Sequence, residues 1–366
     1  MKTPIRVLGA SVVSVVLCLI ATVACWQQPD PWAAILIWPH WFWLIPALLL
    51  TGLSWHRNAK WFATLTGLGW LAFAGFFIEE LHWHPPGLAP AGEKLRVVSL
   101  NCAGGNKLAA AEVINLNPDI AFFQESPDAH DIAAVARQLY GRDAGLALGG
   151  RKVASAEVIA LNPDIRVDHH SPATPEVTAV AHSRNSPHTV LTIGADTMII
   201  ARGQVTPVAV ENPWNMNFTE ARVTLTNGLQ VAVICLRLMP YSLRADVWSP
   251  DYWDTQAEVR RRQHMLLDRL IKRLDNIPRE LPLIVGGDFN LGGNDALLRR
   301  LKPRLHDTFL SAGSGLGNTL INEFPFVRID QIWINDAVYA TQVFVQRTEN
   351  SDHRMVIADF VLPRNR

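Results

Sequence analysis

The first quarter of this 366-residue chain has very little charge. Only seven of residues 1–90 are charged, whereas nine of the 13 tryptophans of the chain lie there. A water-exposed domain of average composition has about a quarter of its residues charged. The deficit therefore excludes an ordinary soluble domain at this end, while the remainder of the sequence has the composition of one globular domain.

The chain also lacks a net charge and has few cysteines. Its 33 basic and 33 acidic residues cancel, which excludes proteins that coat nucleic acid and acidic disordered tails. Four cysteines exclude a disulfide-rich scaffold. Cys102 and Cys235 each follow or end a predicted strand. They either form a disulfide in an oxidising compartment or stay buried as free thiols.

Three uncharged stretches, 7–26, 32–53 and 61–78, are predicted to form transmembrane helices. At about 1.5 Å of rise per residue, each covers a hydrocarbon core roughly 30 Å thick. Pro39 and Pro46 predict a kink in the second stretch. The first stretch alone also resembles a signal peptide, but two further stretches follow it directly.

The basic residues of the short loops predict the orientation in the membrane. Lys2 and Arg6 precede the first stretch, and Arg57 and Lys60 separate the second from the third. Basic loops remain in the cytoplasm. We therefore expect residues 1–84 to be a multi-pass domain in the lipid bilayer of the cell membrane, with a cytoplasmic N-terminus and an extracytoplasmic C-terminal domain.

A linker rich in proline and glycine, 85–94, is predicted to join the membrane domain to a second domain, 95–366. Strands outnumber helices in it, and Asn227-Gly228 predicts a hairpin. An α/β (α+β) sandwich with mixed or antiparallel sheets is expected, although 141–196 shows no sustained period. Apolar runs predict strands at Leu95–Leu100, Ile120–Gln124, Thr197–Ala201, Arg222–Thr226, Gln230–Leu236, Pro282–Val285, Arg328–Ile334, Gln342–Gln346 and Met355–Val361, and an amphipathic pattern predicts a helix at Thr255–Asp275.

Polar side chains recur at or near the ends of these predicted strands. Each one alone is more often a turn former or a cap than a functional residue. Together they are the inventory of an oxygen-ligand magnesium site beside a general base. The set consists of Asn101, Glu125, Asp288, Asn290, Asp330, Asp352 and His353.

Five short motifs follow one another along the second domain. They are Val97-Val98-Ser99-Leu100-Asn101, Asn117-Pro118-Asp119-Ile120 leading to Gln124-Glu125, Gly286-Gly287-Asp288-Phe289-Asn290, Arg328-Ile329-Asp330-Gln331-Ile332 and Ser351-Asp352-His353-Arg354. In this order they resemble the endonuclease/exonuclease/phosphatase superfamily, which includes deoxyribonuclease I. The resemblance covers roughly residues 95–363 and implies a four-layer sandwich of two packed β-sheets flanked by helices.

The resemblance implies a divalent metal, Mg²⁺ or Mn²⁺, with Glu125 as its main carboxylate ligand and Asn101 and Asp352 nearby. A phosphodiester is already anionic, so attack on it requires a neutralising cation with hard oxygen ligands. The expected activity is that of a phosphohydrolase, and most simply a phosphodiesterase. Its expected partner is a phosphoester substrate, either nucleic acid or a membrane phospholipid, and no protein partner is inferable.

The resemblance also implies catalytic roles for four residues. Asp288 is expected to orient or deprotonate the attacking water, and Asn290 to hold a phosphate oxygen. His353 is expected to contact the scissile phosphate, with Asp330 fixing and charging its imidazole. A histidine held by a carboxylate suits this chemistry, because it donates or accepts a proton near neutral pH.

The sequence departs from the family pattern at Arg237, which stands where many members have a histidine. Arginine binds a phosphate oxygen bidentately but does not act as an acid at neutral pH. Arg237 is therefore expected to be either a phosphate clamp in an active enzyme or the mark of a catalytically weakened binding or sensor protein that retains the fold.

Overall fold

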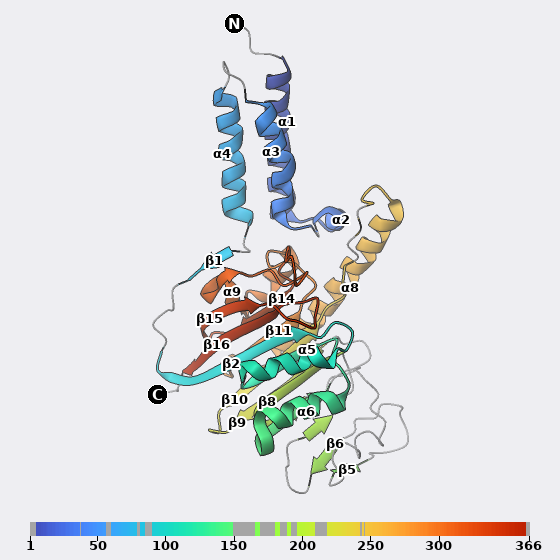
Figure 1. Cartoon of the computed structure of the whole chain (residues 1–366), viewed down its shortest axis with the longest axis vertical. Helices are drawn as coiled ribbons and strands as arrows, with labels where there is room; N and C mark the ends of the chain where they lie inside the picture. Colours follow the sequence, from blue (N-terminus) through green and yellow to red (C-terminus); the bar gives the residue numbers. More distant parts are fainter. Residues whose placement is uncertain are drawn as a thin grey trace.

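The computed structural model describes residues 5–36, 38–55, 60–78, 81–84, 90–148, 165–168, 180–183, 189–191, 196–208, 218–241, 244 and 246–363. A bundle of N-terminal helices stands at one end of a larger α/β domain (Figure 1). Most of the segment 141–196 and part of the expected linker 85–94 lie outside the described residues.

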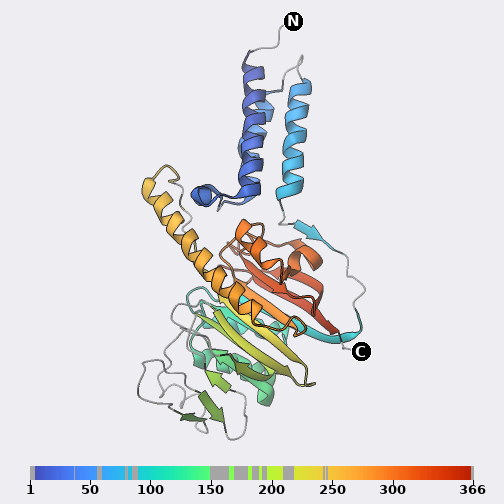
Figure 2. The same ribbon diagram turned by 180° about the vertical axis from the view of Figure 1, so that it is seen from behind.

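Three helices make up the bundle and lie side by side in both views (Figures 1 and 2). They are α1 (Ile5–Gln27), α3 (Leu44–Leu53) and α4 (Lys60–Phe77). Small and aromatic side chains fill the interior, and the indole of Trp70 donates a hydrogen bond of 3.1 Å to Ser14. Between α1 and α3 run the short elements η1 (Asp30–Trp32), α2 (Ala33–Leu36) and η2 (His40–Trp43).

The prediction of three transmembrane helices is wrong. Within the described residues, α1 alone has the length and the apolar composition of a membrane span. The second predicted span is divided, because Pro39 precedes η2 and α3 begins only at Leu44. The third, α4, has 18 residues, or roughly 27 Å, and begins at the charged Lys60.

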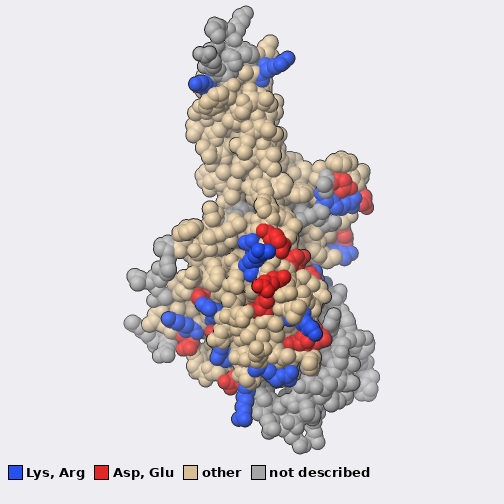
Figure 3. Space-filling view, viewed as in Figure 1, with Lys and Arg blue, Asp and Glu red and all other residues tan. Residues whose placement is uncertain are grey.

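The outer surface of the bundle is apolar. Leu19 on α1, Leu48 on α3 and Leu71 on α4 are all exposed. The space-filling view shows Lys and Arg side chains at the far end of the bundle and an uncharged surface between them and the α/β domain (Figure 3). The exposed apolar surface therefore extends over all three helices of the bundle.

A twelve-stranded mixed sheet forms the framework of the α/β domain within the described part of the chain. Off its main path, β4 (Ala144–Leu148) pairs with β7 (Thr189–Leu191) and β8, and β5 (Ile165–Asp168) pairs separately with β6 (Val180–Ser183). Along the main path the strands are β12 (His306–Asp307), β14 (Asp330–Ile334), β11 (Leu283–Asp288), β10 (Gln230–Arg237), β9 (Phe218–Leu225), β8 (Thr197–Pro207), β3 (Ile120–Gln124), β2 (Gly92–Asn101), β16 (Met355–Pro363) and β15 (Tyr339–Gln346).

The strand β8 joins two halves of this sheet, so the expected pair of separate sheets is one curled sheet. Residues 197–201 pair with β3, and residues 203–207 pair with β9. Gly203 stands at the change of partner with φ of +138°. A Cβ atom there would lie 2.3 Å from the carbonyl oxygen of Thr224, so only glycine permits this close approach.

The two halves face each other across an apolar core. Val97 and Phe122 from β2 and β3 belong to the same buried cluster as Val233 and Ile332 from β10 and β14. On the outer face of the first half lie α5 (Lys107–Glu112), η3 (Val113–Leu116), α6 (Ala129–Tyr140) and η4 (Gly141–Asp143), and on that of the second lie α8 (Pro250–Asp275) and η6 (Ala296–Leu301). The domain therefore has four layers, with the two halves of the sheet in the middle and a layer of helices on each outer face.

The sequence located several elements well. The strand Ile120–Gln124 has the predicted bounds, and a turn at Gly228 joins β9 and β10 as the Asn-Gly pair predicts. Helix α8 begins five residues earlier than predicted, because Ser249 precedes it and Pro250 suits its first position. Strand β2 begins at Gly92, inside the predicted linker.

The two cysteines of the domain do not form a disulfide. Cys102 and Cys235 are both free and fully buried. Burial raises the pKa of Cys235 to about 12, which keeps it a thiol at neutral pH. Of the two alternatives that the sequence left open, the structure has the buried free thiols.

Specific contacts dock the foot of the bundle on the domain. Strand β1 (Leu81–Trp83), just after α4, pairs with β13 (Ser314–Leu316), which follows the short helix α9 (Thr308–Ala312). The side chain of Asn294 donates to the carbonyl oxygen of Phe77 at 2.9 Å. Arg260 of α8 pairs with Asp30 at 3.0 Å. The bundle and the domain are therefore joined by hydrogen bonds and ion pairs as well as by the chain itself.

Substitution of Gly203 by alanine is expected to destabilise the domain by about 3 kcal/mol, because it adds a clash and an unfavourable φ. The measurement is thermal and chemical unfolding of the full chain in detergent, followed by circular dichroism. Gly228→Ala is the matched control, since Gly228 also has a positive φ of +84° but no atom within 4 Å of the added methyl group. Equal losses in the two variants would contradict the role given to β8.

Candidate active site

The ends of five strands meet at one edge of the curled sheet. Strands β2 and β3 run parallel, as do β10 and β11, so their carboxyl ends lie together. Strand β14 runs antiparallel to β11, which sets its first residue, Asp330, opposite Asp288. This topology brings together Asn101, Glu125, Arg237, Asp288 and Asp330, as the sequence predicts.

A buried ion pair between Asp330 and His353 forms the centre of the site. Asp330 Oδ2 lies 2.8 Å from His353 Nδ1, and both side chains are almost completely buried. Two hydroxyl groups fix the backbone around them. Thr319 accepts a hydrogen bond from the amide of Asp330, and Thr348 donates one to the carbonyl oxygen of His353. The contact of Nδ1 with Asp330 orients the imidazole, and Nε2 lies on the opposite side of the ring.

Nearby negative charges raise the pKa of His353. Burial alone opposes the charged imidazolium. The carboxylates of Asp330, Asp288 and Asp352 outweigh burial and raise the pKa of His353 to about 10. The imidazole is therefore positively charged at neutral pH.

Asp288 is held beside this pair by three hydrogen bonds. Its carboxylate accepts from the amide nitrogen of Asn290 at 2.9 Å, from the Asn290 side chain at 3.0 Å and from the Asn101 side chain at 3.0 Å. Burial first, and then the charge of Asp330, raise the pKa of Asp288 to about 7. A carboxylate with that pKa accepts a proton readily at neutral pH.

Glu125 forms a second centre with Arg237, across the two halves of the sheet. The guanidinium lies 2.5 Å from Glu125 Oε1 and 3.3 Å from Asp196 Oδ2. The other oxygen of Glu125 accepts from the amide of Gly104 at 2.7 Å, and the Asn101 side chain donates to Oε1 at 3.3 Å. Sequence reasoning placed Arg237 at the site but did not anticipate its ion pair with Glu125.

Two of the three predicted metal ligands are in direct contact. Asn101 and Glu125 are in contact, and Asp352, which has an exposed side chain, directly precedes His353 and contributes to the raised pKa of that histidine. The carboxylate oxygens of Asp288 and Asp330 suit a hard cation, whereas the charged imidazole of His353 lies beside them without a free ligand atom. Asp330 Oδ1 is buried without a hydrogen-bond partner, and ligand atoms of Asp288, Asp330 and His353 lie within 4.8 Å of one another. The donors present are mainly oxygen atoms, which suit Mg²⁺ or Mn²⁺.

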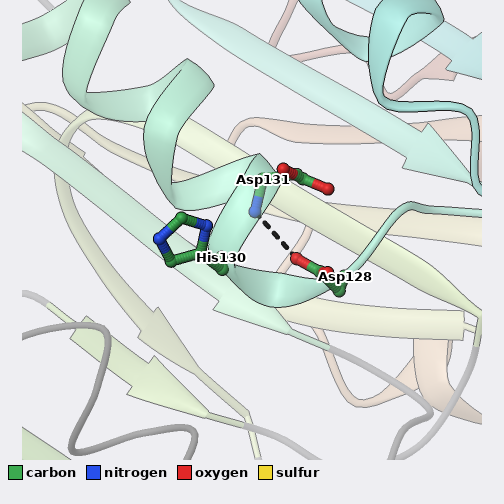
Figure 4. Close-up of side chains that lie close together, drawn as sticks. All are labelled: Asp128, His130 and Asp131. Carbon is green, nitrogen blue, oxygen red and sulfur yellow. Dashed lines mark hydrogen bonds between the residues drawn. The ribbon is translucent and has the colours of Figure 1, made fainter.

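A second group of acidic and histidine side chains lies at the start of α6 and has a structural explanation. Asp128, His130 and Asp131 are close together on the surface (Figure 4). Asp128 caps the helix by accepting a hydrogen bond from the amide of Asp131 at 2.9 Å. The cap accounts for this cluster.

A family model described as Endonuclease/Exonuclease/phosphatase family matches residues 98–353. The matched region contains every strand end that builds the site. The chain belongs to the endonuclease/exonuclease/phosphatase family. The family that the motifs between Val97 and Arg354 suggested is thus confirmed. The chain has the phosphoesterase fold of this family with a buried cluster of aspartate and histidine side chains.

Several solved structures resemble the chain in overall fold. An endonuclease/exonuclease/phosphatase from Beutenbergia cavernae is 15% identical, with a TM-score of 0.47, over 74% of this chain and 72% of that one. A family protein from Bacteroides thetaiotaomicron is 14% identical, with a TM-score of 0.47, over 75% and 98%. Beta toxin from Staphylococcus aureus is 15% identical, with a TM-score of 0.43, over 72% and 99%. No curated protein matches the chain.

Proposed function

We propose that this family member is a divalent-metal-dependent phosphodiesterase anchored to a membrane. The observation that carries the proposal is the buried Asp330–His353 pair, 2.8 Å apart, beside the protonatable Asp288. The charged imidazole of His353 supplies a hydrogen-bond donor to the reacting centre, and the Asp288 carboxylate, with a pKa of about 7, supplies a base.

In this proposal Asp288 takes a proton from the water that attacks phosphorus. The two asparagines that donate to it, Asn101 and Asn290, hold its oxygens in place. His353 donates from Nε2 to a phosphate oxygen, because Nδ1 is occupied by Asp330. Charge that develops on the phosphoryl oxygens is thereby stabilised by a fixed donor.

The proposed metal ligands remain Glu125, Asn101 and Asp352. When bound, a divalent cation supplies positive charge that neutralises the phosphate and the leaving oxygen. Arg237, held by Glu125 in the structure, is proposed to clamp a non-bridging phosphate oxygen through its planar fork.

One observation favours a second candidate function. The guanidinium of Arg237 lies 2.5 Å from Glu125, the main proposed metal ligand, and so places a competing cation on it. A chain in which this ion pair persists would be a catalytically weakened binding or sensor protein that retains the family fold.

Membrane anchoring is proposed through α1. Its 23 residues extend about 35 Å, enough for one span of the hydrocarbon core. It also contacts both the bundle and the α/β domain, since Ser14 accepts from Trp70 of α4 and the backbone carbonyl oxygen of Trp26 accepts from Arg299 of η6 at 2.8 Å. These contacts favour a retained anchor over a cleaved signal peptide. The extracytoplasmic position of the domain stays a prediction from the basic residues near the N-terminus.

Hydrolysis of bis(4-nitrophenyl) phosphate by the full chain in detergent tests the proposed reaction. Activity is expected to disappear in EDTA and return with Mg²⁺ or Mn²⁺. His353→Ala is expected to lower the rate by at least about 100-fold, because the charged donor is lost. His306→Ala, at an exposed histidine paired with Asp336, is the control. Full activity in chelator would refute the metal dependence.

The pH–rate profile is expected to be bell-shaped. The rate rises with pH as Asp288 ionises, with its pKa of about 7, and falls as His353 loses its proton, with its pKa of about 10. Asp330→Asn removes a negative charge that raises both pKa values, so both limbs should move to lower pH. Asp336→Asn should leave the profile unchanged. Limbs that stay in place in Asp330→Asn would contradict the assignment.

Arg237 variants separate the clamp from the weakened site. If Arg237 clamps the phosphate, Arg237→Ala should cost roughly 2–4 kcal/mol of transition-state stabilisation, or about 30- to 1000-fold in kcat/KM. Arg237→Lys should recover only part, and Arg237→His should keep activity with a further ionisation near neutral pH. A nearly inert wild type that Arg237→His accelerates would instead favour the binding or sensor function.

A further inference from the structure

Exposed apolar side chains gather where the bundle meets the α/β domain. We call them the apolar collar. Single exposed apolar residues are ordinary, but a group at one level of a molecule marks an interaction surface. Trp83, Trp248 and Phe324 are 80%, 80% and 77% exposed. The full collar consists of Leu81, Trp83, Trp248, Leu316, Ile321 and Phe324.

Hydrogen bonds place each part of the collar against the foot of the bundle. Leu81 pairs with Leu316 across strands β1 and β13. The indole of Trp41 in η2 donates to the carbonyl oxygen of Phe326, two residues after Phe324, at 3.2 Å. Tyr252, near Trp248, donates to the carbonyl oxygen of Ala34 at 3.1 Å. In both ribbon views β1 and the free end of α8 flank the foot of the bundle (Figures 1 and 2).

The collar adjoins the candidate active site. Leu320, the neighbour of Ile321, forms a β-bridge with His353, and the amide of Asn322 donates to the carbonyl oxygen of Asp352 at 2.7 Å. On a second loop, Asn290 of the site is four residues from Asn294, which binds the end of α4. Four residues span at most about 14 Å, so the site lies close to the foot of the bundle.

We propose that the apolar collar lies in the interfacial layer of a lipid bilayer and holds the active site over the headgroups, so that the substrate is the phosphoester of a membrane lipid. The inference rests on the proposed phosphodiesterase function and adds a substrate class to it. It also adds a second membrane contact, distinct from α1.

Continuity with the bundle favours lipid over a second copy of the chain. The surface of the bundle is uncharged from near its far end to the α/β domain (Figure 3), and α1 has the length of one bilayer core. Tryptophan prefers the membrane interface, which is where this arrangement puts Trp83 and Trp248. Two nearby arginines are paired with acidic residues, Arg347 with Glu323 and Arg244 with Asp246. These paired charges do not form the basic stripe that a nucleic-acid-binding surface uses.

Lipid contact is tested with the full chain in vesicles of phosphatidylcholine, phosphatidylglycerol and sphingomyelin. An environment-sensitive fluorophore is attached in Phe324→Cys and in the control Leu108→Cys, where Leu108 is 57% exposed on α5. The unsubstituted chain gives the background from its own cysteines. Lipids with bromine or a spin label near the headgroup are expected to quench the label at position 324 at least about threefold more than that at 108. Equal quenching at positions 324 and 108 would contradict contact of the collar with lipid. A second copy of the chain covering the collar would give the same result and would also contradict it.

Hydrolysis is tested on the same vesicles by phosphorus NMR. The double variant I321S/F324S is expected to cleave vesicle lipid about tenfold more slowly than wild type and to hydrolyse bis(4-nitrophenyl) phosphate in detergent at the wild-type rate. Leu108→Ser should change neither rate. A wild type that hydrolyses the soluble ester but no vesicle lipid would overturn the lipid substrate alone. A wild-type chain that hydrolyses neither the soluble ester nor vesicle lipid would contradict the proposed function. The quenching experiment would then still test whether the collar contacts lipid.

Discussion

The burial of Asp288 and Asp330 opposite each other is the constraint on which the rest of the site depends. The register of β11 and β14 fixes this arrangement, and burial removes the water that would screen the two charges. His353 offsets one charge, and Asn101 and Asn290 donate to the other carboxylate. The protonation of the centre is therefore set by the fold, and every proposed catalytic role depends on that balance.

The geometry of the site depends in turn on how the two halves of the sheet pack. The ion pair of Glu125 with Arg237 and the hydrogen bond of Asn101 with Asp288 both cross from one half to the other. The distance between the halves is set by side chains such as Phe122. A Cβ atom at position 286 would lie 2.7 Å from the Phe122 ring, so Gly286, near the end of β11, lets the halves come together.

The sequence predicted what is local and missed what depends on partners. The strand Ile120–Gln124 was predictable, because a fully apolar run follows Asn117-Pro118 and is buried on both faces. The strand-end residues were predictable because polar groups interrupt such runs. The sequence predicted a kink at Pro39 but not that the helix stops there and resumes only at Leu44, so it overcounted the spans. The change of partner within β8 and the ion pair of Arg237 with Glu125 were not predictable, since both join segments distant in sequence.

The shared strand β8 also has a consequence for how the domain loses its structure. Two sheets held only by side-chain packing can separate, leaving one folded and the other open. Here the backbone hydrogen bonds of β3 and β9 end on the same continuous strand, so opening either half exposes the edge of the other. The halves are thus one cooperative unit, and proteolysis of the native protein should either spare both strand ends of the site or remove them together.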